Sequence, residues 1–128
     1  MKSPSRLLPV LSPYAEQIVK GEKVWELRST NTQVRERVGI ALVGTKTVIG
    51  DVRVVDSREV SRDELREYQD LHRVTPESIE RMFSVKKKCF AWILELPREY
   101  PNPVPYEHPQ GAIVWIQCRP LVGVDYVA

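Results

Sequence analysis

Apolar and polar residues alternate along three stretches of the chain, at 24–29, 47–55 and 90–96. Successive side chains of a strand point to opposite faces, so a two-residue period is typical of strands that bury one face. Residues 38–43 are an apolar run without such alternation, which predicts a strand buried on both faces. In all, the pattern predicts about six strands, at 6–11, 24–29, 38–43, 47–55, 90–96 and 112–118.

Three other segments carry helix signals. A serine and a proline open a short amphipathic helix over 12–21, and Gly21 ends it. A capping-box pattern that begins at Ser61 predicts a polar helix to about residue 72, and a Thr-Pro-Glu sequence opens another over 75–83. The last two helices form one insert between strands.

These elements predict one α+β domain over residues 1–128, built as a small, partly closed β-barrel with three short helices. The regular strand-helix-strand alternation of a doubly wound sheet is missing, and a chain of this length suffices for one core. The proline-rich segment 100–111 is interpreted as a stiff surface loop, because proline fixes an extended backbone and interrupts strand pairing. Alternatively, Tyr100, Tyr106 and His108 form one wall of a cleft, where aromatic faces stack on bases.

The amino-acid composition narrows the class of protein further. The chain is 42% hydrophobic and 28% charged, as in ordinary globular proteins. No apolar stretch approaches the roughly 20 residues of a membrane helix, and the start lacks the features of a signal peptide. Cys89 and Cys118 have no ligand-like spacing and are expected to be buried free thiols, which favours a cytoplasmic location. The net charge of +2 is small, so any anion site must be local.

The densest group of functional side chains is the segment 21–28, which contains Gly21, Lys23, Glu26 and Arg28. Strand periodicity places Glu26 and Arg28 on one face, where they either pair with each other or jointly face a ligand. Trp25 is expected on the opposite, core-facing side. Simple alternation puts Lys23 out of phase, unless the backbone after Gly21 is still turning. An ion-paired edge strand and a ligand site both fit this pattern.

The sequence Gly-x-Lys-x-x-Glu-x-Arg after a short helix resembles the signature of the activating signal cointegrator homology (ASCH) family. The resemblance extends to the order of helix, motif strand, hairpin, helical insert and strand. It implies a fold like that of pseudouridine synthase and archaeosine transglycosylase (PUA) domains, and a cleft that binds RNA. Gly21, Lys23, Glu26 and Arg28 would then be the RNA- or nucleotide-binding residues.

The same resemblance implies a second possibility, an enzyme. Some bacterial ASCH proteins hydrolyse N4-acetylcytidine, and others have been assigned ribonuclease activity. The motif lysine is catalytic in the amidohydrolase group, which would make Lys23 and Glu26 the catalytic pair, although that group has threonine in place of Glu26. Its catalytic glutamate corresponds only loosely to Glu77 or Glu80. A glutamate beside Lys23 should keep the lysine charged, which favours ligand binding over proton abstraction.

The remaining candidates are weaker. The lysine run 86–88, with Arg35, Arg37 and Lys46, could neutralise phosphates, but solvated surface charge is the simpler interpretation. His72 and His108 lack metal-ligand spacing, so we predict neither a metal nor a cofactor. A protein-interaction module that uses the proline-rich segment and the apolar residues 121–127 is a third possibility.

Overall fold

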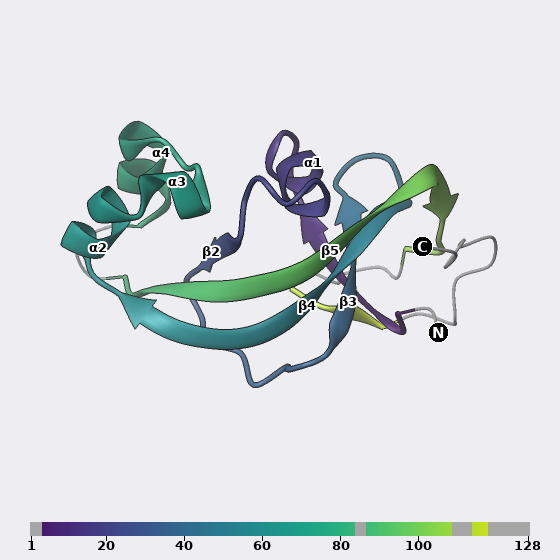
Figure 1. The fold of residues 1–128 in the computed structure, drawn as a ribbon, viewed down its shortest axis with the longest axis horizontal. Coiled ribbons are helices and arrows are strands. Elements are labelled where there is room, and N and C mark those ends of the chain that lie inside the picture. The colour runs from purple at the N-terminus through teal and green to yellow at the C-terminus, as the bar shows by residue number, and fades with distance from the viewer. Residues whose placement is uncertain (1–3, 84–86, 109–113, 118–128) are drawn as a thin grey trace.

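A computed structural model of the chain describes residues 4–83, 87–108 and 114–117 (Figure 1). Its strands are β1 (Arg6–Val10), β2 (Trp25–Arg28), β3 (Arg37–Leu42), β4 (Thr47–Val60), β5 (Cys89–Pro105) and β6 (Ile116–Gln117). Its helices are α1 (Tyr14–Val19), α2 (Arg62–Glu67), α3 (Gln69–His72) and α4 (Pro76–Met82). The α+β class and the six strands predicted from the sequence are confirmed.

The strands form one sheet in the order β2-β5-β4-β3-β1-β6. β1 and β3 are parallel, and the other neighbouring strands are antiparallel. β4 and β5 are long and curved, but the described sheet is open, with β2 and β6 at its edges (Figure 1). The predicted helix over 61–72 divides into α2 and α3, because Tyr68 leaves the helical region of backbone conformation at φ −104° and ψ 32°.

The proline-rich segment differs from the prediction, because residues 100–105 belong to β5 rather than to a surface loop. Val104 pairs with Val48 of β4, and the backbone N–H of Tyr106 donates to the carbonyl of Lys46 at 3.1 Å. Pro105 is one position before that donor, so its missing N–H lies on the side away from β4, where a strand tolerates it.

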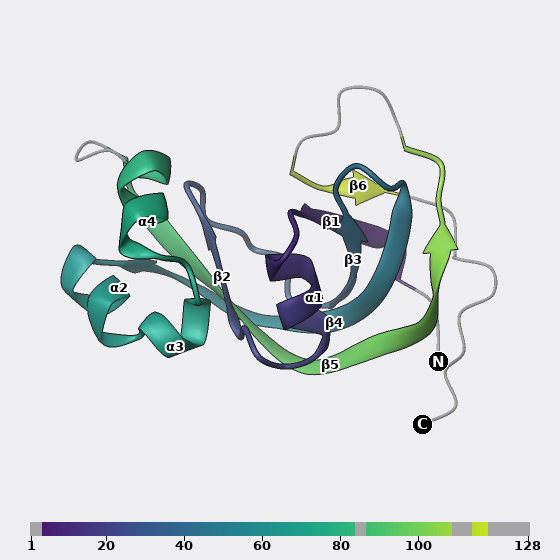
Figure 2. The same cartoon turned by 90° about the horizontal axis from the view of Figure 1, so that it is seen from above.

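The core has two main parts. α1 packs on the sheet over buried residues of β1, β3, β4 and β5, among them Trp92. α2, α3 and α4 gather at one end of the molecule, beside β2 (Figure 2), and enclose a second cluster that contains Trp25, Leu27 and Cys89. The expected burial of Trp25 and of the Cys89 thiol is confirmed. Cys118, residues 112–113 of the last predicted strand and the apolar residues 121–127 lie outside the described residues.

Gly50 shows why α1 can lie so close to the sheet. A Cβ atom on this residue would collide with the carbonyl of Arg98 and with the side chain of Val19 on α1. Glycine on β4 therefore fixes the close approach of α1 to the long strands. Within the part of the chain that the structure describes, no helix is long and apolar enough to cross a membrane.

Candidate ligand-binding cleft

The turn between α1 and β2 brings Lys23 beside the strand residues of the motif. Gly21 has φ +81°, a left-handed conformation that glycine adopts without strain, and its N–H donates to the carbonyl of Ile18. The carbonyl of Gln17 then accepts from the N–H of Lys23 at 3.1 Å. Lys23 is therefore still part of the turn, which is the condition for it to reach the same side as Glu26.

Lys23 is almost completely buried, with 1% of its surface exposed. Its Nζ donates to the backbone carbonyl of His72 at 2.5 Å and lies 3.7 Å from Oε1 of Glu26 and 5.1 Å from the ring centre of Tyr14. Burial lowers the pKa of Lys23 to about 8, although Glu26 acts to raise it. Glu26 thus acts in the expected direction, but the cost of desolvating the ammonium outweighs its attraction and sets the direction of the pKa shift.

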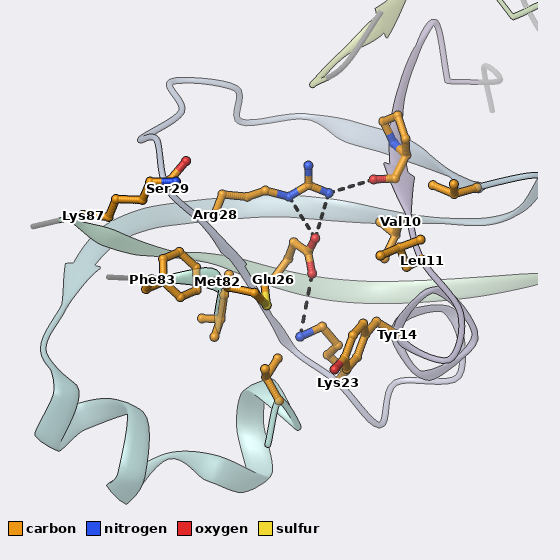
Figure 3. Close-up of a pocket in the computed structure, with 14 residues that line it drawn as sticks. Val10, Leu11, Tyr14, Lys23, Glu26, Arg28, Ser29, Met82, Phe83 and Lys87 are labelled. Atoms are coloured by element: carbon orange, nitrogen blue, oxygen red, sulfur yellow. Dashed lines mark hydrogen bonds and ion pairs between the residues drawn. The ribbon is translucent and has the colours of Figure 1, made fainter. Parts of the chain in front are cut away.

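Glu26 lies between the two cations of the motif (Figure 3). Its Oε2 accepts from Nε of Arg28 at 2.9 Å, and Nη2 of Arg28 lies 2.8 Å from the same oxygen. Nη2 also donates to the carbonyl of Pro9 at 2.7 Å, and the guanidinium lies 5.6 Å from the ring centre of Trp92. Arg28 thus occupies one oxygen of Glu26, and the other oxygen faces Lys23.

These three side chains line a cavity of about 390 Å³ between β1, α1, β2 and the end of α4. Its other walls are largely apolar, which leaves the three charged groups as the principal polar feature. The complete lining comprises Pro9, Val10, Leu11, Tyr14, Lys23, Glu26, Leu27, Arg28, Ser29, Val43, Val74, Met82, Phe83 and Lys87. The ion pairs expected from the sequence are therefore present, and the same residues line the cavity that is the candidate ligand site.

Several residues of the cavity had no functional signal in the sequence. Tyr14, Met82 and Phe83 fit helical periodicity and look like ordinary core residues, yet each borders the cavity. They border the cavity only because the fold brings α4 opposite α1. Conversely, Glu77 and Glu80 of α4 do not line the cavity, and the side chain of Glu80 pairs with Arg62.

The described residues of the proline-rich segment, 100–108, are also absent from the cavity lining. Tyr100 is buried, and its hydroxyl donates to Asp51 at 2.7 Å. Tyr106 and His108 contact each other, with 3.0 Å between the hydroxyl and Nδ1. Tyr100, Tyr106 and His108 therefore do not form a wall of this cleft.

His72 supports the site without lining it. Its Nδ1 accepts from the N–H of Val74 at 3.0 Å, so the neutral ring carries its hydrogen on Nε2, which lies 2.6 Å from the carbonyl of Leu65. Burial lowers the pKa of His72, which keeps the ring neutral. Among residues 4–83, 87–108 and 114–117, no group of three or more His, Cys, Asp or Glu side chains is placed to hold a metal.

Two of the basic residues considered as phosphate contacts are engaged elsewhere. Nη1 of Arg37 lies 2.5 Å from Oδ1 of the fully buried Asp51, and Arg35 donates to the carbonyl of Thr32 at 2.8 Å. Lys87 differs, because it borders the cavity. Lys86 lies outside the described residues.

Comparisons with known proteins give a consistent family. The ASCH domain family model matches residues 8–104. The crystal structure of ASCH from Zymomonas mobilis superposes with a TM-score of 0.74 at 17% identity, over 89% of this chain and 87% of that chain. A tyrosine-to-phenylalanine mutant of ZmASCH gives 0.73 at 18% identity over 89% of both chains. A serine-to-alanine mutant gives 0.69 at 17% identity over 93% and 92%. No curated protein matches the chain.

Proposed function

The chain belongs to the ASCH domain family, and on that premise we propose that it binds RNA or a nucleotide in the cleft lined by Lys23, Glu26 and Arg28. The observation that supports the proposal is that these three side chains line one largely apolar cavity. Its volume of about 390 Å³ lies within the range of about 300 to 1,000 Å³ that is usual for small-molecule sites.

The contents of the cleft suit a nucleobase. Tyr14, which is partly exposed, offers aromatic surface on which a base can stack, and the buried Phe83 adds to the apolar wall. The Lys23 ammonium is a hydrogen-bond donor, and the Glu26 carboxylate is an acceptor 3.7 Å away. A base edge with neighbouring acceptor and donor groups could satisfy both. The proposal includes a cytoplasmic location, in which the buried Cys89 stays reduced.

The first test is equilibrium binding of short RNA and of ribonucleotides to the wild type, Lys23→Ala and Arg28→Ala. Each substitution should weaken binding about tenfold or more, because a charge-assisted hydrogen bond contributes roughly 1.5 to 3 kcal/mol. Affinity should also fall as salt rises. Exposed residues outside the cleft supply matched controls, Lys20→Ala and Arg53→Ala, which should bind like the wild type. Unchanged affinity in both cleft variants, with folding verified by circular dichroism, would contradict the proposal.

A hydrolase that uses the same cleft is a second candidate, favoured by one observation. Burial brings the pKa of Lys23 to about 8, close to the value at which a lysine serves as a general base near neutral pH. Glu26 is near enough to orient a water molecule, and Arg28 could stabilise charge that develops in the transition state.

If the protein is a hydrolase, turnover should depend on both Lys23 and Glu26 and should continue in EDTA, because these side chains supply the base and the charge. Glu26→Gln keeps the shape but removes the carboxylate, so it should abolish turnover of RNA or of N4-acetylcytidine. Glu26→Thr restores the residue of the amidohydrolase group, and a gain of activity on N4-acetylcytidine in this variant would show that the chain has diverged from that reaction. Full turnover by Lys23→Ala would remove this site from the reaction. Loss of turnover in EDTA that a divalent ion restores would contradict the metal-free mechanism.

A further inference from the structure

A second cavity of about 220 Å³ adjoins the cleft, between the ends of β4 and β5 and the beginning of α2. Its polar lining carries three cationic side chains, from Arg62, Lys87 and Lys88, and one carboxylate, from Glu59. The thiol of Cys89 also borders it, and burial raises the pKa of that thiol to about 12, so the thiol adds no negative charge. Within its lining, this cavity is predominantly cationic.

The two cavities share a boundary. Phe83 and Lys87 line both of them. In the close-up of the cleft, Phe83 and Lys87 lie at one end and Tyr14 at the other, with Glu26 between them (Figure 3). A ligand that occupies the cleft beside Phe83 can therefore extend past Lys87 into the second cavity.

The cationic side chains of the second cavity have partners that a phosphate can replace. Lys88 lies 3.8 Å from Glu59, and both side chains are more than half exposed. Arg62 pairs with the exposed Glu80 of α4 and also donates to the carbonyl of Phe83. Exposed ion pairs contribute roughly 0 to 1 kcal/mol, so a phosphate with several acceptor oxygens can compete for these cations. Lys87 has no ion pair within the described residues.

We propose that this second cavity is a phosphate subsite, which binds a phosphate group of the same ligand whose base occupies the cleft. The inference rests on the proposed function and narrows it, because the preferred ligand is then a nucleotide or an RNA strand rather than a free nucleoside. The cleft recognises the base through Lys23 and Glu26. Arg62, Lys87 and Lys88 neutralise the attached phosphate.

The test compares the dissociation constants of the four ribonucleosides with those of their 3′- and 5′-monophosphates at low salt. For at least one base, one monophosphate isomer should bind about tenfold or more tightly than its nucleoside, as expected for a charge-assisted contact. Lys88 lines only the second cavity. Lys88→Ala should reduce the advantage of the monophosphate to about threefold, and Lys88→Glu should abolish it, because the phosphate then meets a like charge. The control Lys20→Ala should leave it unchanged.

The outcomes separate this inference from the proposed function. If nucleosides bind in a way that depends on Lys23 and Arg28 but neither monophosphate binds more tightly, the cleft is correct and the phosphate subsite is wrong. The same holds if the advantage survives in Lys88→Glu. If neither nucleosides nor monophosphates bind, the proposed function is wrong, and the phosphate subsite is wrong as well.

Discussion

Lys23 is the residue on which the chemistry of the cleft depends. A buried ammonium needs partners, and the structure supplies the His72 carbonyl, the Glu26 carboxylate and the face of the Tyr14 ring. These contacts hold Nζ at a fixed point of the wall while burial brings its pKa to about 8. At neutral pH the lysine is mainly charged, and it loses that charge within reach of ordinary buffers.

Binding should therefore weaken as the pH rises through about 8, far below the usual lysine value of 10.5. An oligonucleotide of adenine and cytosine suits the measurement, because its bases do not titrate in that range. Lys23→Met removes the titrating group and should bind weakly with a flat profile. Wild-type affinity that stays constant well above pH 8 would contradict this role. Stability should move the opposite way, rising between pH 8 and 10.5, because the unfolded state there holds the proton that folded Lys23 has lost.

At the scale of elements, the cleft depends on the attachment of α3 to β2. The N–H of Val24 donates to the carbonyl of Leu71 at 2.9 Å, and Lys23 contacts the neighbouring carbonyl of His72. The His72 ring in turn joins Leu65 of α2 to Val74, which borders the cleft. The backbone carbonyls of Leu71 and His72 thus connect the helical insert to the motif strand, and the buried His72 ring joins segments within the insert.

His72→Gln should lower the free energy of unfolding at pH 7 by roughly 1 to 3 kcal/mol, because one of the two buried backbone partners loses its hydrogen bond. The dependence of stability on pH in the acid range tests His72 separately. The pKa of His72 is lowered from 6.5, so below that pH the unfolded state binds more protons and the wild type loses stability. Urea denaturation at both pH values should therefore show that the free energy of unfolding falls less between pH 7 and pH 5 in His72→Gln than in the wild type. An equal loss in both proteins would mean that His72 does not contribute to acid sensitivity.

Also at the element scale, alternation predicted the burial of several apolar side chains on β4 and β5. Val48, Val52 and Val54 are buried as their two-residue period predicts, and so is Trp92. Leu96 was expected to share the face of Trp92 but is 62% exposed, because its backbone turns to φ +52° and breaks the alternation. The two-residue period of a sequence carries no signal for such an irregularity or for the register shifts between β4 and β5.

At the scale of the whole molecule, the predictable and unpredictable parts of the site have different origins. The charged residues Lys23, Glu26 and Arg28 lie within six positions of one another, so a local motif was enough to find them. The cavity lining also includes Tyr14 of α1 and Phe83, which follows α4, and only the assembled fold brings them to the same cavity (Figure 3). The depth of burial of Lys23 also depends on the helical insert, and this is why its lowered pKa was not foreseen.

The most direct test of the central claim is an NMR titration of isotopically labelled protein with short single-stranded RNA, following the backbone amide signals. We predict that the largest, saturable shift changes occur at Tyr14, Lys23, Arg28 and Phe83, around the cleft. Asn102 and Val104 of β5, which do not line the cleft, should change little. Shift changes concentrated at Asn102 and Val104, or none at all at saturating RNA, would contradict the assignment of this cleft as the binding site.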